Sequence, residues 1–244
     1  MALKHNAFDK FADTFLTDYM DLMSRFYQTV RSMLNEPRQV IDSYLHGGSK
    51  DFMHPLLFCF IGAAIVIVLN TLFLDFSLEH VAGDLEGESE ALRQLTYWTQ
   101  IVSVRAATQF FPLSLIVLCI ISLSAGAILF LRDKTNGFFD FLAINTYSIG
   151  ASMVVLPLLI PVWAFSGQSL TDPFINSTVP AMVVSGMILW IYNLYFKPSG
   201  FLEWLRILSG YITGYVIFVL FSGFAASVLG YMIFAIDRLS SLSA

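Results

Sequence analysis

Residues 7–34 carry apolar side chains at alternating steps of three and four, and this spacing predicts one face of an α-helix of about seven turns. The face consists of Phe8, Phe11, Phe15, Tyr19, Leu22, Phe26, Val30 and Met33, named here the aromatic stripe. Aspartate and arginine side chains occupy the opposite face. Surface helices that bind anionic lipid are usually rich in lysine and arginine. Because aspartate outnumbers the basic residues here, docking of the stripe on protein is favoured at least as much as docking on lipid.

A break follows this helix at Asn35 and Pro37, and the pattern then predicts a short second helix over residues 37–46. Gly47 and Gly48 end that helix, because glycine adopts the backbone conformation that follows a helix C-terminus. Residues 1–53 are therefore expected to form a cytoplasmic or interfacial amphipathic helix followed by a short helix.

Five long apolar runs follow, and crossing the hydrocarbon of a bilayer takes about 20 residues. They cover residues 55–74, 110–131, 138–165, 179–196 and 207–236 approximately. The third and fifth runs are long enough to tilt, and Pro157 and Pro161 are expected to kink the third. The pattern predicts an all-α integral membrane protein whose five-span membrane domain occupies residues 54–238.

Two segments outside these runs complete the predicted arrangement. Residues 75–109 form an acidic loop that ends in a helical stretch at 90–109, either an interfacial helix or an extension of the second span. Residues 239–244 form a short tail.

Lysine and arginine are distributed unequally between the segments that join the spans. Ten lie in the N-terminal region and in the loops 132–137 and 197–206, while Arg93, Arg105 and Arg238 lie in the alternate segments. Cationic residues concentrate on the cytoplasmic side of membrane proteins. The chain is therefore expected to be a multi-pass protein of the bacterial inner membrane, with its N-terminus in the cytoplasm and its C-terminus outside.

Composition supports lipid as the environment and argues against several classes of function. Hydrophobic residues make up 57% of the chain and charged residues 13%, against about 25% charged in soluble domains. The net charge of -5 and the lack of a basic cluster argue against a nucleic-acid partner. Neither a phosphate-binding loop nor a zinc-binding motif occurs. No catalytic, cofactor-binding or metal-binding residue is predicted.

Polar residues inside the third span form the strongest candidate for a substrate site. Asn145 and Tyr147 lie within it, and Asp140 lies near its cytoplasmic start. These three can line a polar cavity that the proline kink opens, or they can hydrogen-bond to neighbouring helices. A lipid-modifying enzyme would instead combine Asp140 and Asn145 with Arg132 and Lys134 at the interface.

Small residues recur at steps of four in the fifth span and are named here the small-residue ridge. Its members are Gly210, Gly214, Ser222, Ala226 and Gly230. Such a ridge lets another helix approach closely. The contact is expected either within the chain or between copies.

Two short motifs lie within residues 29–60. They consist of Pro37, Val40, Ile41, Tyr44, Leu45 and Gly47, then Pro55, Leu56 and Phe58. With these motifs the segment resembles a bacterial membrane family, the domain of unknown function 3667 family, whose members pair a short cytoplasmic helix, P-x-x-V-I-x-x-Y-L-x-G, with P-hydrophobic-x-F at the start of the first span. Many members begin with a zinc ribbon, which this chain lacks, so the resemblance implies no metal site. The five-span plan is also similar to Yip-type membrane domains.

These observations favour a non-enzymatic scaffold or interaction subunit of a membrane complex. Its expected partners are the bilayer and either another protein or further copies of the chain. The alternative is a small permease, or an accessory subunit of a transporter, that uses the polar patch of the third span.

Overall fold

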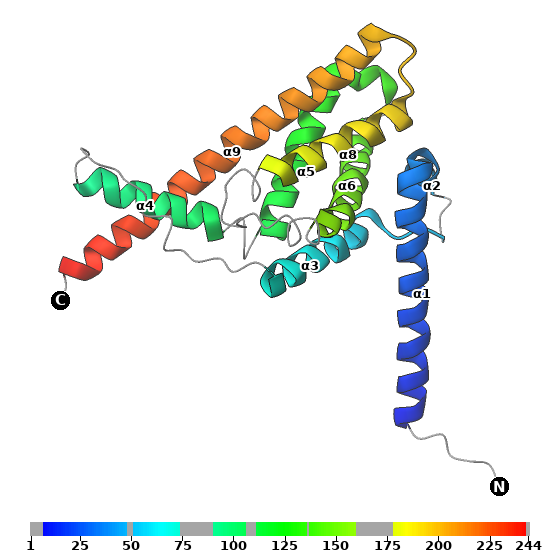
Figure 1. The fold of residues 1–244 in the computed structure, drawn as a ribbon, viewed down its shortest axis with the longest axis horizontal. Coiled ribbons are helices and arrows are strands. Elements are labelled where there is room, and N and C mark those ends of the chain that lie inside the picture. Colours follow the sequence, from blue (N-terminus) through cyan, green and yellow to red (C-terminus); the bar gives the residue numbers. More distant parts are fainter. Residues whose placement is uncertain are drawn as a thin grey trace.

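The computed structural model describes residues 7–47, 51–73, 90–105, 111–135, 137–159 and 178–242. Within these ranges all regular elements are helical, as expected from the sequence, and Figure 1 shows their arrangement. The elements are α1 (Ala7–Asn35), α2 (Pro37–Leu45), α3 (Pro55–Phe73), α4 (Glu90–Arg105), α5 (Phe111–Leu131), η3 (Arg132–Lys134), α6 (Phe138–Val155), η4 (Leu156–Leu158), α8 (Val179–Phe196) and α9 (Phe201–Leu242).

Four of the described helices are long and apolar enough to cross a membrane. They comprise Ile116–Lys134, Phe138–Leu158, Val179–Phe196 and Phe201–Ile236. A shorter apolar helix covers Pro55–Leu69, within the first expected span. Much of this apolar surface faces outward, because only 6% of the most apolar window of Phe201–Ile236 is buried inside the protein. Length, composition and outward-facing apolar surface together define a membrane protein.

Helix α6 forms the centre of the fold and packs against α3, α5 and α8. Most of its 18 residues are buried, including Ser148 and Ser152. Both serine hydroxyls donate to the carbonyl four residues earlier in the helix, Ile144 and Ser148 respectively. These bonds let α6 carry polar residues on a face that contacts other helices.

The α-helix of the third expected span ends two residues before Pro157. Helix α6 stops at Val155, and Pro157 lies in the 3-10 turn η4. Proline has no N–H to donate and clashes with the preceding turn, so a change of helix type here has a direct steric cause. Pro161 and the rest of the expected span to residue 165 lie outside the described residues.

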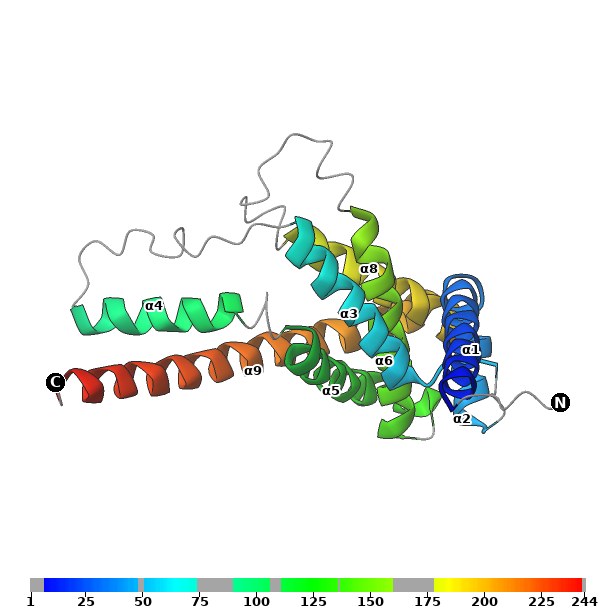
Figure 2. The same ribbon diagram turned by 90° about the horizontal axis from the view of Figure 1, so that it is seen from below.

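Helix α9 is longer than the fifth expected span. It begins at Phe201, inside the expected loop 197–206, and continues to Leu242, inside the expected tail. Its first half packs on α5, and α4 lies along its second half. Figures 1 and 2 show the second half of α9 running past the bundle with α4 beside it. The helical stretch expected at 90–109 corresponds to α4, while the acidic loop 75–89 lies outside the described residues.

The N-terminal helices α1 and α2 pack on each other and on α6. Pro37 begins α2, where a missing N–H costs little. Gly47 follows α2 with a left-handed φ of 74°, which glycine adopts without strain. Figure 1 shows α1 attached near its C-terminal end and extending away from the bundle toward its N-terminal end.

Candidate functional site

Asn145 and Tyr147, expected either to line one polar cavity or to hydrogen-bond to neighbouring helices, contact different neighbours in the structure. Residues two positions apart on a helix point in nearly opposite directions. Asn145 faces α5 and α8, whereas Tyr147 faces helix α2 and the residues at the start of α3. Asn145 and Tyr147 therefore belong to separate surroundings. Asp140 lies half-buried in the first turn of α6.

The Asn145 side chain joins three helices inside the bundle. Its Nδ2 donates to Ser124 Oγ on α5 at 3.0 Å, and its Oδ1 accepts from the Tyr192 hydroxyl on α8 at 2.6 Å. Asn145, Ser124 and Tyr192 are all fully buried. The Ser124 hydroxyl in turn donates to the Ile120 carbonyl at 2.7 Å. Each polar end of the Asn145 amide thus has a partner inside the protein, as buried polar groups require.

Tyr147 belongs to a second polar group, which attaches α1 to the bundle. Its hydroxyl donates to the Met53 carbonyl at 2.7 Å, and the Met53 N–H donates to Thr29 Oγ1 on α1 at 2.9 Å. The Thr29 hydroxyl donates to the Arg25 carbonyl at 2.7 Å. Thr29 and Met53 are buried, so these bonds connect α1, the start of α3 and α6 without exposed polar atoms.

Aromatic rings pack around this attachment, which is named here the α1 junction. The Phe58 ring lies 5.6 Å from that of Phe26 on α1 and 6.1 Å from that of Tyr147, between ring centroids. Tyr44 of α2 contacts Tyr147 edge-on at 6.0 Å. A Cβ at Gly150 would lie 2.6 Å from the Phe58 ring, so the glycine provides the space that this ring occupies. The junction is therefore closely packed.

Helix α2 has its own polar contacts with α8 and α3. The Tyr195 hydroxyl donates to Asp42 Oδ1 at 3.1 Å, and Arg38 Nε donates to Asp42 Oδ2 at 3.1 Å. Tyr44 and His54 are joined at 3.3 Å between the hydroxyl and Nε2. Asp42 and His54, which the sequence analysis does not single out, thus fix α2 against the bundle.

The aromatic stripe of α1 is divided between the chain's own core and its surface. Leu22, Phe26 and Val30 pack against the core and Met33 is fully buried, whereas Tyr19 is 49% exposed. Leu22 and Phe26, expected to face a partner, therefore contact this chain itself. Phe8, Phe11 and Phe15 lie in the part of α1 whose side chains are outside the described residues.

The small-residue ridge of α9 contacts two other helices of the same chain. A Cβ at Gly214 would lie 2.6 Å from Leu123 Cα, and one at Gly126 of α5 would lie 2.3 Å from the Gly214 nitrogen. At Gly230 an added Cβ would lie 2.6 Å from Thr99 Oγ1 on α4. Ser222 and Ala226 are half-buried between these contacts. The first ridge residues thus meet α5 and the last meets α4.

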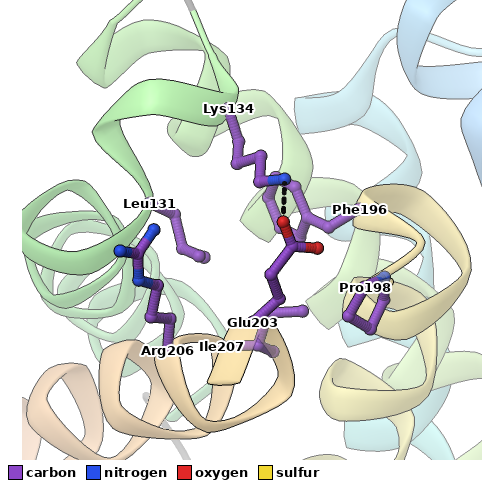
Figure 3. A pocket seen from close by; sticks show the side chains of 7 residues that line it. All are labelled: Leu131, Lys134, Phe196, Pro198, Glu203, Arg206 and Ile207. Atoms are coloured by element: carbon purple, nitrogen blue, oxygen red, sulfur yellow. Dashed lines mark hydrogen bonds and ion pairs between the residues drawn. The ribbon is translucent and has the colours of Figure 1, made fainter. Parts of the chain in front are cut away.

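Two ion pairs connect η3 to the start of α9. Lys134 Nζ lies 3.0 Å from Glu203 Oε1, and Arg206 lies 3.6 Å from Asp133. Figure 3 shows Lys134 meeting Glu203 in a pocket that Leu131, Phe196 and Ile207 also line. The cavity that these residues line has a volume of about 10 Å³, the room of a single water molecule. The cavity is too small for a substrate, and the ion pairs beside it join η3 to α9.

Two of the residues considered for lipid chemistry, Lys134 and Asn145, bond to other side chains. Lys134 pairs with Glu203, and Asn145 bonds to Ser124 and Tyr192. Arg132 is exposed in η3. Among the described residues, no group of three or more histidine, cysteine, aspartate or glutamate side chains is placed to hold a metal ion.

Comparison of the chain with models of known protein families, with curated proteins and with solved structures finds no match. The resemblance of residues 29–60 to the domain of unknown function 3667 family therefore remains a prediction from its residues.

Proposed function

We propose that this chain is a non-enzymatic scaffold or interaction subunit of a bacterial inner-membrane complex. The observation that supports the proposal is that the polar side chain of Asn145 hydrogen-bonds to neighbouring helices. Asn145 is fully buried, and the two ends of its amide bond to Ser124 and Tyr192. Polar groups bonded in this way hold helices together. The rigid bundle then presents α1 as an arm for protein contacts.

The second candidate is a small permease or an accessory subunit of a transporter. The polar side chains that meet between α5, α6 and α8 favour it, because transporters bind substrates between such helices. A permease would have to break the 2.6 Å bond between Tyr192 and Asn145 to open a path there. The scaffold function is preferred because it requires no hydrogen bond of the packed interior to break.

The proposed topology has five spans, with α3 as the first, a cytoplasmic N-terminus and an external C-terminus. It is supported by the apolar helix Pro55–Leu69 and by the ten cationic residues on one side. Alkaline phosphatase fused after residue 244 is expected to be active, because this enzyme matures only outside the cytoplasm. A fusion after residue 200, in the loop 197–206, is the matched control and is expected to be inactive. Inactivity of the first fusion and activity of the second would overturn this topology.

A partner is expected to dock on the part of the aromatic stripe that lies N-terminal to the α1 junction. Phe15→Ser together with Tyr19→Ser removes two of its rings while leaving the α1 junction intact, so co-purification of a partner should fall about ten-fold. The measurement is purification in a mild detergent followed by mass spectrometry. Gln28→Ser is the control, because Gln28 is exposed and lies outside the stripe. Equal recovery of partners with the double variant and the control would contradict docking through this face.

A further inference from the structure

We propose that His54 is a pH-sensitive cap on α3, which holds α2 and α3 together when its ring is neutral and releases them when the ring is protonated. His54 precedes Pro55, the first residue of α3. Its carbonyl accepts from the Phe58 N–H at 2.9 Å, so His54 is the N-cap residue of that helix. The proposed scaffold function holds with or without this device.

Both nitrogens of the His54 ring make hydrogen bonds, one to each helix. The Leu56 N–H in the first turn of α3 donates to Nδ1 at 3.3 Å. Nε2 lies 3.3 Å from the Tyr44 hydroxyl of α2. The rings of His54 and Tyr44 also meet edge-on, with their centroids 5.3 Å apart. One side chain thus joins the end of α2 to the start of the first expected span.

The partner of Nδ1 determines where the proton of the neutral ring lies. A backbone N–H can only donate, so Nδ1 must accept with its lone pair, and the single proton of a neutral imidazole is on Nε2. Nε2 then donates to the Tyr44 oxygen. The neutral ring therefore suits both neighbours, and it gives one N–H of the first turn of α3 a partner that helix ends otherwise lack.

A second proton on the His54 ring removes this cap. Protonated Nδ1 is a donor, and it faces the Leu56 N–H, which is a donor as well. The positive ring also lies at the N-terminus of α3, which is the positive end of the helix dipole. Because both effects are unfavourable, the ring must turn away from α3. Turning the ring separates Nε2 from Tyr44, so the link between α2 and α3 is broken.

His54 is placed to respond to the pH of its surroundings. Its side chain is exposed, so it exchanges protons with solvent. Tyr44 faces the ring from α2, and Tyr147 of α6 packs on Tyr44 with ring centroids 6.0 Å apart. Asp51 is an exposed charged residue of the segment that leads into α3. Among histidine, tyrosine and aspartate, histidine is the side chain that changes charge between about pH 8 and pH 5.

His46 bonds in the opposite sense and provides a contrast within the same region. Its Nδ1 lies 2.8 Å from the Asp42 carbonyl oxygen. A carbonyl only accepts, so this Nδ1 carries a proton in both charge states, and protonation of the ring preserves the bond. His46 also follows the C-terminus of α2, where a positive charge is favourable. The Asp42 carboxylate is bonded to Arg38 and Tyr195. Acid is therefore expected to act through His54.

Loss of the cap weakens the segment to which α1 is attached. The preceding residue, Met53, bonds to Thr29 of α1 through its N–H and to Tyr147 of α6 through its carbonyl. Phe58, four residues after the cap, packs on α1. A helix end without a cap opens more readily, and opening of the first turn of α3 displaces both attachments. Helix α1 is therefore expected to leave the bundle more often at acidic pH.

Spin labels on the purified full-length chain test this release. They replace Gln28 of α1 and Leu202 of α9, which are both exposed, and are attached through a keto amino acid so that the native cysteines stay unlabelled. Between about pH 8 and pH 5, the population at long distances is expected to rise about five-fold, the effect of losing one N-cap on an equilibrium.

Two histidine variants assign the response. His54→Asn keeps an oxygen that can cap α3 but does not titrate, so its distances are expected to stay at the pattern of the neutral wild type throughout. His46→Asn is the matched control and is expected to respond as the wild type does. An unchanged wild type, a response retained in His54→Asn, or one lost in His46→Asn would overturn the proposal.

The position of the ring protons gives an independent test that needs no movement of α1. In protein isotope-labelled at the histidine nitrogens, NMR of the neutral state is expected to show the His54 proton on Nε2 and the His46 proton on Nδ1. Each signal is assigned by its disappearance in the corresponding asparagine variant. A His54 proton on Nδ1 would overturn the cap, whatever the spin labels show.

Discussion

Gly126→Ala is expected to lower the free energy of unfolding by about 3 kcal/mol, the upper end of the cost of overpacking a core. The added Cβ would lie 2.3 Å from the Gly214 nitrogen and 2.4 Å from the Gly210 carbonyl oxygen. Both are backbone atoms of α9 that cannot rotate away as a flexible side chain can. Helices α5 and α9 must therefore separate, and the contacts along their interface are lost.

Three alanine variants provide a graded comparison for this prediction. At Gly214 the new Cβ would lie 2.6 Å from Leu123 Cα, at Gly210 its nearest neighbour is 3.4 Å away, and at Gly223 nothing lies within 4 Å. Thermal unfolding in detergent is expected to show a large loss for Gly126 and Gly214, a small one for Gly210 and none for Gly223. Equal melting temperatures for the Gly126 and Gly223 variants would refute the α5–α9 contact.

Phe58→Ala is the second substitution with a large expected effect, a loss of about 3 kcal/mol. Phe58 is fully buried and packs on both Phe26 and Tyr147, so its removal leaves a cavity at the α1 junction. Helix α1 should then detach from the bundle more often. Trypsin cleavage at Arg25 and Arg31 of α1 can then report the detachment.

Limited trypsin digestion of the purified protein measures the detachment. Cleavage after Arg31 is expected to become about ten-fold faster in Phe58→Ala, since cleavage of helices depends on local opening. Phe139→Ala is the control, because Phe139 is 80% exposed and its ring contacts Phe138, outside the α1 junction. Unchanged cleavage together with an unchanged melting temperature would show that Phe58 does not hold α1.

The helices themselves were predictable because periodicity and apolar length are local properties of the chain. The break at Pro37 and the helix at 37–46 follow from proline and glycine chemistry, and α2 covers Pro37–Leu45. The steps of four in the small-residue ridge likewise predicted a close helix approach. The pattern could not reveal that an added Cβ has less space at Gly214 than at Gly210, because the space depends on where α5 crosses α9.

The arrangement of the polar residues required the three-dimensional structure. Asn145 and Tyr147 are two positions apart, so the rotation of the helix directs them to different neighbours, and the sequence left open whether they line a cavity or bond to neighbouring helices. Nothing local indicates that the Met53 backbone would bond to both Thr29 and Tyr147.

The length of α9 has a consequence for how the protein sits in a bilayer. Its apolar part, Phe201–Ile236, has 36 residues, or about 54 Å of helix, against about 30 Å of hydrocarbon. Because Glu203 and Arg206 form ion pairs near its N-terminal end, the helix must tilt, extend beyond the hydrocarbon, or do both. A thicker bilayer would cover more of its length, including the part near Gly230 where α4 packs closely.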